Sequence, residues 1–140
     1  MRFGHTNGLV ERCEMATAAD LKATFSTVRS LLKRYQPPLE ATVNRAARYE
    51  LWSRRDVVIE GRTRSEIFFA SVIIQKDYVG FYFMPVYADT RLKSVFKPEL
   101  LQPLKGKSCF HLKVLDRELT SQIRSALAVG FAMYKKRGWV

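Results

Sequence analysis

The stretch "EIFFASVIIQKDYVGFYFMPVY", Glu66 to Tyr87, decides the fold class of this chain. Its first nine residues are apolar nearly throughout and have strand length, a pattern typical of a strand at the centre of a sheet. A short turn, "QKDY", follows, and "VGFYFMPVY" predicts a second strand in which Val79, Phe81 and Phe83 face the opposite side from the residues between them. The stretch therefore predicts two adjacent antiparallel strands.

The sequence before this stretch predicts a helix and further strands. Apolar residues recur at spacings of three and four from Leu21 to Tyr35, which places them on one face of a helix from about Ala18 to Tyr35. Thr17 and Asp20 have the spacing of a capping box at its start. The segment "ATVNRAARYELWSRRDVVIEG", Ala41 to Gly61, is rich in branched and aromatic residues, so it extends the sheet to an antiparallel meander of three or four strands. Gly61 and its neighbours, "EGRTRS", predict a polar turn.

The sequence after this stretch predicts short helices, one more strand and a long last helix. Pro98 suits the first turn of a short helix, and "SCFHLKVL", Ser108 to Leu115, has the alternation of a strand. Apolar residues from Leu119 to Tyr134 share one face of a final helix that Asp116 can cap and Gly138 can end. This order predicts an α+β domain in which the N-terminal and C-terminal helices pack on one face of an antiparallel sheet.

Length and composition indicate a single globular domain. The chain has 140 residues, 47% of them hydrophobic, which is enough for one core. Residues 1–14 show neither helical nor strand period, so we expect a disordered extension there, holding His5 and Cys13, and one domain over 15–140. The sequence has no apolar run of about 20 residues that would span a bilayer, no signal-peptide core, and two cysteines that make no disulfide framework. These features predict a cytoplasmic protein with no membrane partner.

Charge is the strongest compositional signal. Lys and Arg together number 24 against 13 acidic residues, and the resulting net charge of +11 attracts polyanions. Bases could stack on a sheet surface formed by aromatic residues near cations, so a nucleic-acid-associated protein is one hypothesis. The residues of this surface would be Tyr49, Trp52, Tyr78, Tyr82 and Tyr87, near Arg48, Arg54, Arg55 and Lys76. The segment "VGFYFMPVY" lacks the pattern of an RNA-recognition motif, however, and an ordinary basic surface is the simpler interpretation.

Cys109 and His111 stand two residues apart in the last predicted strand. They share with Lys113 the face opposite the apolar residues between them. Lys113 could lower the pKa of the thiol, which leaves a cryptic enzyme using Cys109 as an alternative hypothesis. No motif supplies an oxyanion site or a third orienting group, and a zinc site needs three or four ligands. We therefore expect a non-catalytic strand face, with no metal and no cofactor.

Three segments of the chain resemble a known family. The segments "FASVIIQKDYVGFYFMPVY", "ELLQPLKGKSCFHLKVLD" and "GFAMYKKRGWV" resemble the YdhG-like family of small bacterial domains of unknown function, which is grouped by fold with YjbR and the frataxin-type protein CyaY. The resemblance covers about residues 15–140 and implies helices against a curved antiparallel sheet. Some relatives are labelled iron chaperones after frataxin, where an acidic helix face holds iron. The matching helix here, "DLKATFSTVRSLLKRY", is basic, so this label does not carry over.

The sequence thus predicts a binding or accessory domain without catalytic activity. Its partner would be a small anionic ligand or a protein, bound at the sheet face or beside "MPVYADTRLK". The candidate ligand-binding residues are polar-tipped or expected on an exposed face, and they are Tyr82, Met84, Tyr87, Lys107, His111 and Trp139.

Overall fold

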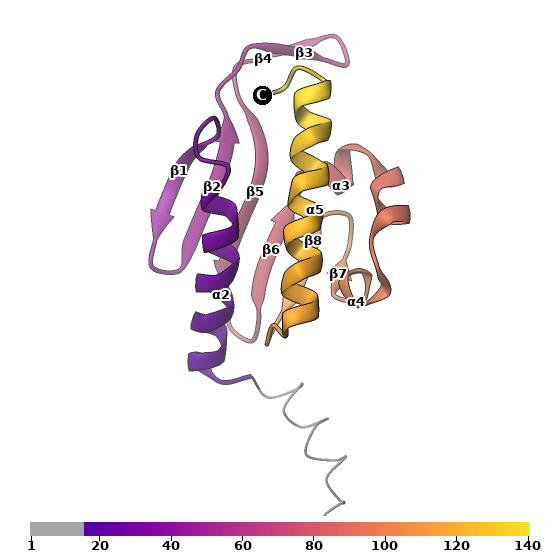
Figure 1. Cartoon of the computed structure of the whole chain (residues 1–140). Coiled ribbons are helices and arrows are strands. Elements are labelled where there is room, and N and C mark those ends of the chain that lie inside the picture. Colours follow the sequence, from indigo (N-terminus) through magenta and orange to yellow (C-terminus); the bar gives the residue numbers. More distant parts are fainter. Residues whose placement is uncertain (1–15) are drawn as a thin grey trace, which may run out of the picture.

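Six antiparallel strands form one sheet, and two long helices lie side by side on one of its faces (Figure 1). The computed structural model describes residues 16–140, so the predictions for residues 1–14, including those for His5 and Cys13, lie outside the described residues. The strands follow the order β1-β2-β5-β6-β8-β7 across the sheet. The predicted α+β architecture, with an N-terminal and a C-terminal helix against an antiparallel sheet, is confirmed.

Along the chain, one long helix is followed by six strands, three short helices, two strands and a second long helix. The sheet consists of β1 (Glu40–Arg45), β2 (Arg48–Ser53), β5 (Ile67–Ile74), β6 (Val79–Phe83), β7 (Leu104–Lys105) and β8 (Cys109–Leu112). The helices are α2 (Ala18–Lys33), α3 (Met84–Ala88), the 3₁₀ helix η1 (Thr90–Val95), α4 (Pro98–Leu101) and α5 (Arg117–Lys136). A separate hairpin of β3 (Val57–Ile59) and β4 (Arg62–Arg64) extends beyond the end of the sheet (Figure 1).

Both long helices lie close to their predicted ranges and have the predicted caps. At the start of α2 the Asp20 N–H donates to Thr17 Oγ1 at 3.0 Å, and the Thr17 N–H donates to Asp20 Oδ2 at 2.9 Å, which completes the capping box. At the start of α5 the Leu119 N–H donates to Asp116 Oδ1 at 2.7 Å. Gly138 follows the last turn of α5 with a φ of 76°, a left-handed conformation that glycine adopts at little cost.

The core lies between the sheet and the two long helices. Phe69 at its centre makes edge-on contacts with Phe83, Phe131 and Tyr134, with ring centroids 5.8, 6.1 and 5.2 Å away. Such edge-to-face pairs are favoured by the charge distribution of aromatic rings. The fully buried Tyr134 hydroxyl donates to the Phe68 carbonyl at 2.6 Å. These contacts fix α5 on β5, the strand that the sequence places at the centre of the sheet.

The predicted second strand is wrong beyond Phe83. Strand β6 ends there, and the residues from Met84 form helix α3 instead of continuing the sheet. Pro85 lacks the N–H that a sheet ladder needs and suits the first turn of a helix. Strict alternation predicted that Met84 shares a sheet face with Tyr82. This prediction is wrong, because Met84 belongs to α3.

The sheet is irregular at both edges. Strand β1 shows a register shift between Ala41 and Val43 in its pairing with β2, and β7 has two residues. The sequence predicted neither β7 nor the β3–β4 hairpin as such. It did predict the turn at Gly61, which is confirmed as the hairpin turn with positive φ at Glu60 and Gly61.

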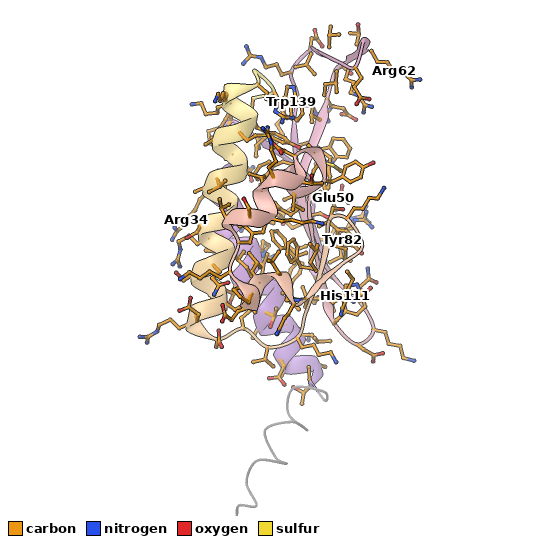
Figure 2. All side chains as sticks on the ribbon, turned by 90° about the vertical axis from the view of Figure 1, so that its right-hand side faces the viewer. Arg34, Glu50, Arg62, Tyr82, His111 and Trp139 are labelled. Carbon is orange, nitrogen blue, oxygen red and sulfur yellow. The ribbon has the colours of Figure 1, made fainter. Side chains whose placement is uncertain are left out.

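The face of the sheet opposite α2 and α5 is covered mainly by its own side chains (Figure 2). The strand registers place on this face Glu50, Trp52, Phe68, Tyr82, Cys109 and His111. Trp52 contacts Phe68 with ring centroids 5.2 Å apart, and its Nε1 donates to Glu50 Oε1 at 3.1 Å. Within residues 16–140, none of the helices combines the length and apolar character needed to cross a bilayer.

Candidate functional site

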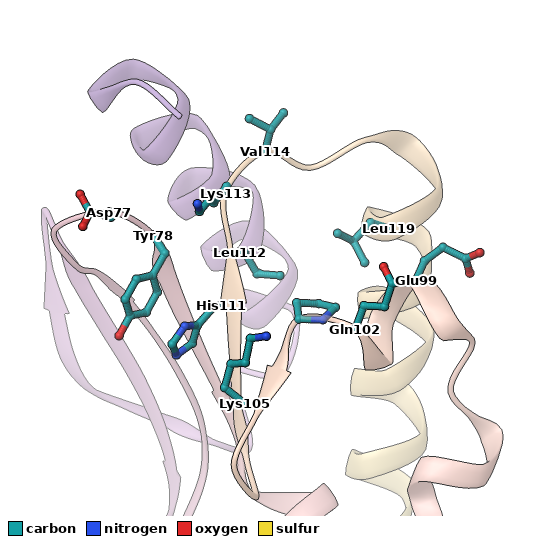
Figure 3. Close-up of a pocket in the computed structure, with 11 residues that line it drawn as sticks. Asp77, Tyr78, Glu99, Gln102, Lys105, His111, Leu112, Lys113, Val114 and Leu119 are labelled. Carbon is teal, nitrogen blue, oxygen red and sulfur yellow. The ribbon is translucent and has the colours of Figure 1, made fainter. Parts of the chain in front are cut away.

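An open hollow of about 620 Å³ lies where β7 and β8 meet α4 and the first turn of α5 (Figure 3). Four segments contribute to it: the β5–β6 turn, the residues from α4 to β7, strand β8 with the residues after it, and the start of α5. The lining side chains include those of Tyr78, Gln102, Lys105, His111, Lys113 and Leu119. The hollow thus joins parts of the chain that are distant in sequence.

His111 and Tyr78 form one wall of the hollow. Their rings stack with centroids 3.9 Å apart and planes inclined by 13°. His111 pairs with Gly80 across β8 and β6, so Tyr78, two residues before Gly80, lies on the same face. The His111 N–H donates to the Pro103 carbonyl at 2.8 Å, which holds its backbone on the other side. Burial lowers the pKa of His111, and the charge of Lys105 lowers it further, so the imidazole is neutral at pH 7.

The lining carries two cationic and two acidic side chains. Lys105 of β7 stands beside the imidazole, and Lys113 follows β8 (Figure 3). On the far side Glu99 accepts a hydrogen bond from Gln122 Nε2 at 3.0 Å, and this bond holds the pKa of the carboxyl below its ordinary value. Asp77 is exposed in the β5–β6 turn, at the margin of the hollow. The side formed by the sheet therefore carries two cations, with the carboxylate of Asp77 at its margin.

The structure gives Cys109 and His111 different tyrosine partners. Both are half-buried on one face of β8, as the alternation predicted. His111 stacks on Tyr78, whereas Cys109 pairs with Tyr82 across β8 and β6, so its thiol lies near the Tyr82 hydroxyl. Burial raises the pKa of the Cys109 thiol more than the nearby Tyr82 hydroxyl lowers it, so the thiol is protonated at neutral pH. In residues 16–140 no three side chains of His, Cys, Asp or Glu are arranged to hold a metal ion.

Tyr82 lies flat on the open face of the sheet. A Cβ at Gly80 would lie 2.9 Å from Tyr82 Cε2, so the ring covers the glycine of its own strand. Gln75 Nε2 donates to the Tyr82 hydroxyl in a long hydrogen bond of 3.4 Å. Tyr82 therefore has a fixed position next to the wall formed by His111 and Tyr78.

The six residues selected from the sequence fall in three places. Tyr82 and His111 share the open sheet face (Figure 2). Tyr87 and Lys107 meet at the side of the sheet, with Lys107 Nζ 5.7 Å from the centroid of the Tyr87 ring, and Met84 begins the adjacent α3. Trp139 lies apart from the rest. The structure therefore does not gather the six into one site.

Trp139 fastens the end of the chain to the fold. Its ring packs edge-on against Tyr134 with centroids 5.0 Å apart, and the Arg137 guanidinium lies 5.0 Å from its ring centroid. The Trp139 carbonyl accepts a hydrogen bond from the Ser53 hydroxyl at 2.5 Å. These contacts show that the Trp139 side chain serves to pack the end of the chain. It lies at the opposite end of the molecule from His111 (Figure 2).

Neither Tyr78 nor Lys105 is among the ligand-binding residues selected from the sequence. Tyr78 was assigned to a turn. It stands two residues before Gly80 and four before Tyr82, so alternation places its side chain on the same sheet face as theirs. The register of β6 against β8 then brings it to His111. Lys105 carried no signal, because a strand of two residues has no period to detect.

Comparison of this chain with protein-family models, with curated proteins and with solved structures finds no match. The resemblance to the YdhG-like family therefore stays a prediction.

Proposed function

We propose that this domain is a non-catalytic binding module that takes a small anion in the hollow beside His111. The observation that carries the proposal is a neutral imidazole held against Tyr78 and next to the ammonium group of Lys105. Lys105 makes no ion pair within 4.0 Å among the described residues, so its charge is open to a ligand. A carboxylate or phosphate group placed here would meet a cation and an imidazole N–H together.

Apolar side chains limit the kind of anion. Leu119 and Val114 line the hollow opposite the imidazole, and Val114 is 54% exposed. A ligand with an apolar portion would cover these side chains and gain about 25 cal/mol for each Å² removed from water. The proposed ligand is therefore a small amphipathic anion, with its charged group toward Lys105 and its apolar portion toward the start of α5.

Binding should depend on pH through His111. The anion's negative charge favours the imidazolium, so it raises the depressed pKa of His111 and binding takes up a proton. The affinity for a fully ionised anion should therefore rise as the pH falls from 8 toward 6. His111→Gln, which keeps a hydrogen-bond donor and cannot titrate, should remove this dependence.

Thermal unfolding against a panel of phosphate esters and short-chain carboxylates, at pH 6 and pH 8, tests the proposal. A ligand at a hundredfold its Kd adds about 2.7 kcal/mol of stability, which raises Tm by several degrees. We expect Lys105→Ala and His111→Gln to lose this shift while keeping their own Tm near that of the wild type.

Lys107→Ala is the matched control, because it removes the same charge two residues from Lys105. The Lys107 side chain lies outside the hollow, over the ring of Tyr87. A shift that survives both Lys105→Ala and His111→Gln, or that Lys107→Ala abolishes equally, would place the ligand elsewhere. A panel in which no small anion raises Tm contradicts the proposal and favours a protein partner.

A further inference from the structure

The outer surfaces of α2 and α5 form a second feature, away from the hollow. The two helices lie side by side and run in the same direction across the sheet (Figure 1). Their cations, with the C-cap residue of α2 included, are Lys22, Arg29, Lys33, Arg34, Arg117, Arg124, Lys135 and Lys136. The acidic side chains within the two helices are those of Asp20 and Glu118, both in first turns. We call this surface the helix layer; its formal charge is +6.

The carboxylates of the helix layer are already engaged at the helix starts. Asp20 accepts the Thr17 N–H in the capping box, and Glu118 accepts a hydrogen bond from Gln122 Nε2 at 3.0 Å. None of the eight cations lies within 4.0 Å of a carboxylate oxygen in the described residues. The positive charge of the helix layer is therefore not neutralised within the part of the chain that the structure describes.

The residues between the cations are small. Apart from Val129, the exposed uncharged positions of the two helices hold Ala and Ser, and Val129 at 39% is their one exposed large hydrophobic side chain among the described residues. Two of the cations are braced by rings of their own helices, with Arg29 5.2 Å from the Phe25 centroid and Lys135 6.0 Å from the Phe131 centroid. The result is a surface of short Ala and Ser side chains with cationic tips.

We propose that the helix layer binds the phosphate backbone of nucleic acid without reading its sequence. Lys, Arg and Ser side chains on helices are the groups that contact phosphates, and the charge of the layer is complementary to a polyanion. α5 has 20 residues and so a length of about 30 Å, which matches roughly nine base steps of a duplex. Helices that insert into membranes carry Trp, Phe or Leu on the inserted face, and the helix layer does not.

Fluorescence anisotropy with a labelled 20-base-pair DNA duplex tests the proposal on the full chain. Titrations at several salt concentrations should give a linear plot of log K against log salt with a slope of about −3.6, the value for four phosphate contacts. The triple variant Arg29→Gln, Lys33→Gln and Arg124→Gln should weaken binding at least tenfold at low salt and make the slope less negative by about 2.7, the value for three lost contacts.

The control must remove the same charge from another surface. The triple variant Arg62→Gln, Arg64→Gln and Lys76→Gln also lowers the net charge by three, but its positions lie in β4 and the β5–β6 turn. We expect it to bind DNA nearly as well as the wild type, and Lys105→Ala, which tests the small-anion site, to bind DNA unchanged. Thermal unfolding of every variant verifies that the fold is intact.

Three results would overturn the proposal. Equal weakening in both triple variants would mean that net charge alone, and not the helix layer, governs binding. No binding to the duplex at 50 mM salt would remove nucleic acid as the partner. Binding to phosphatidylserine vesicles through the same three residues, without binding to the duplex, would assign the surface to an anionic membrane instead.

Discussion

Replacing Gly130 with alanine sets two effects of opposite sign against each other. Gly130 is buried in the middle of α5, where Phe83 and Pro85 pack against the helix. On an exposed helix surface, a change from glycine to alanine stabilises by about 1 kcal/mol. At Gly130, however, the added Cβ would lie 2.5 Å from Phe83 Cζ and 2.8 Å from Pro85 Cγ.

The packing effect should be the larger of the two. Carbon atoms in contact are normally about 3.5–4.0 Å apart, so the ring, the proline or the helix must move by about 1 Å. Phe83 is fully buried and Pro85 is a rigid ring in α3, so neither has free space to enter. Overpacking costs about 1–3 kcal/mol, and after the gain in helix propensity we expect a net loss of about 1 kcal/mol.

Urea and thermal unfolding followed by circular dichroism measure this loss. A domain of this size should lose about 4 °C in Tm for 1 kcal/mol. Ser125→Ala, at an exposed position of the same helix, is the control and should gain about 0.5 kcal/mol. A Gly130→Ala variant that is more stable than the wild type by about 1 kcal/mol, the gain expected from helix propensity alone, would refute the close approach of α5 to α3. It would also refute the placement of the cations that α5 carries.

Two further predictions concern buried polar groups. Tyr134→Phe removes the hydroxyl that donates to the Phe68 carbonyl, and should lower the free energy of unfolding in urea by about 1–3 kcal/mol. The same change at the exposed Tyr87 is the control and should leave the stability unchanged. Equal stabilities of Tyr134→Phe and the wild type would show that this hydrogen bond contributes nothing. In a Cys13→Ser background, Cys109 should react with iodoacetamide more slowly than in the unfolded chain, and its rate should still rise with pH above 8.5, because burial raises the pKa of the thiol. A rate that reaches its plateau below pH 7 would contradict this and restore the hypothesis of a reactive cysteine.

The architecture could be predicted from the sequence because each long element has a clear period and a local stop signal. The capping box at Thr17, the Asp116 cap and the terminal Gly138 are local features, and all three are confirmed. The prediction failed at Met84, where apolar alternation continued past the true end of β6. Pro85 was the local signal against a strand there, and its missing N–H outweighs the pattern.

The candidate site could be predicted only in part, because it depends on pairings between distant strands. His111 was selected from the alternation within β8, which is a local property. Its partner Tyr78 required the register of β6 against β8, and Lys105 required the short strand β7, neither of which a single sequence reveals. Trp139 was selected as an exposed group, but contacts with Tyr134 and Ser53 use it for packing.

The irregular edges of the sheet bear on how the protein behaves at high concentration. A long regular edge strand offers unpaired N–H and C=O groups to another molecule and promotes aggregation. Here the shift between Ala41 and Val43 bends β1, whose last residues Asn44 and Arg45 are polar and exposed, and β7 offers two residues. Neither edge gives a second sheet a continuous row of partners, so the chain can keep a largely aromatic sheet face without strand-to-strand association.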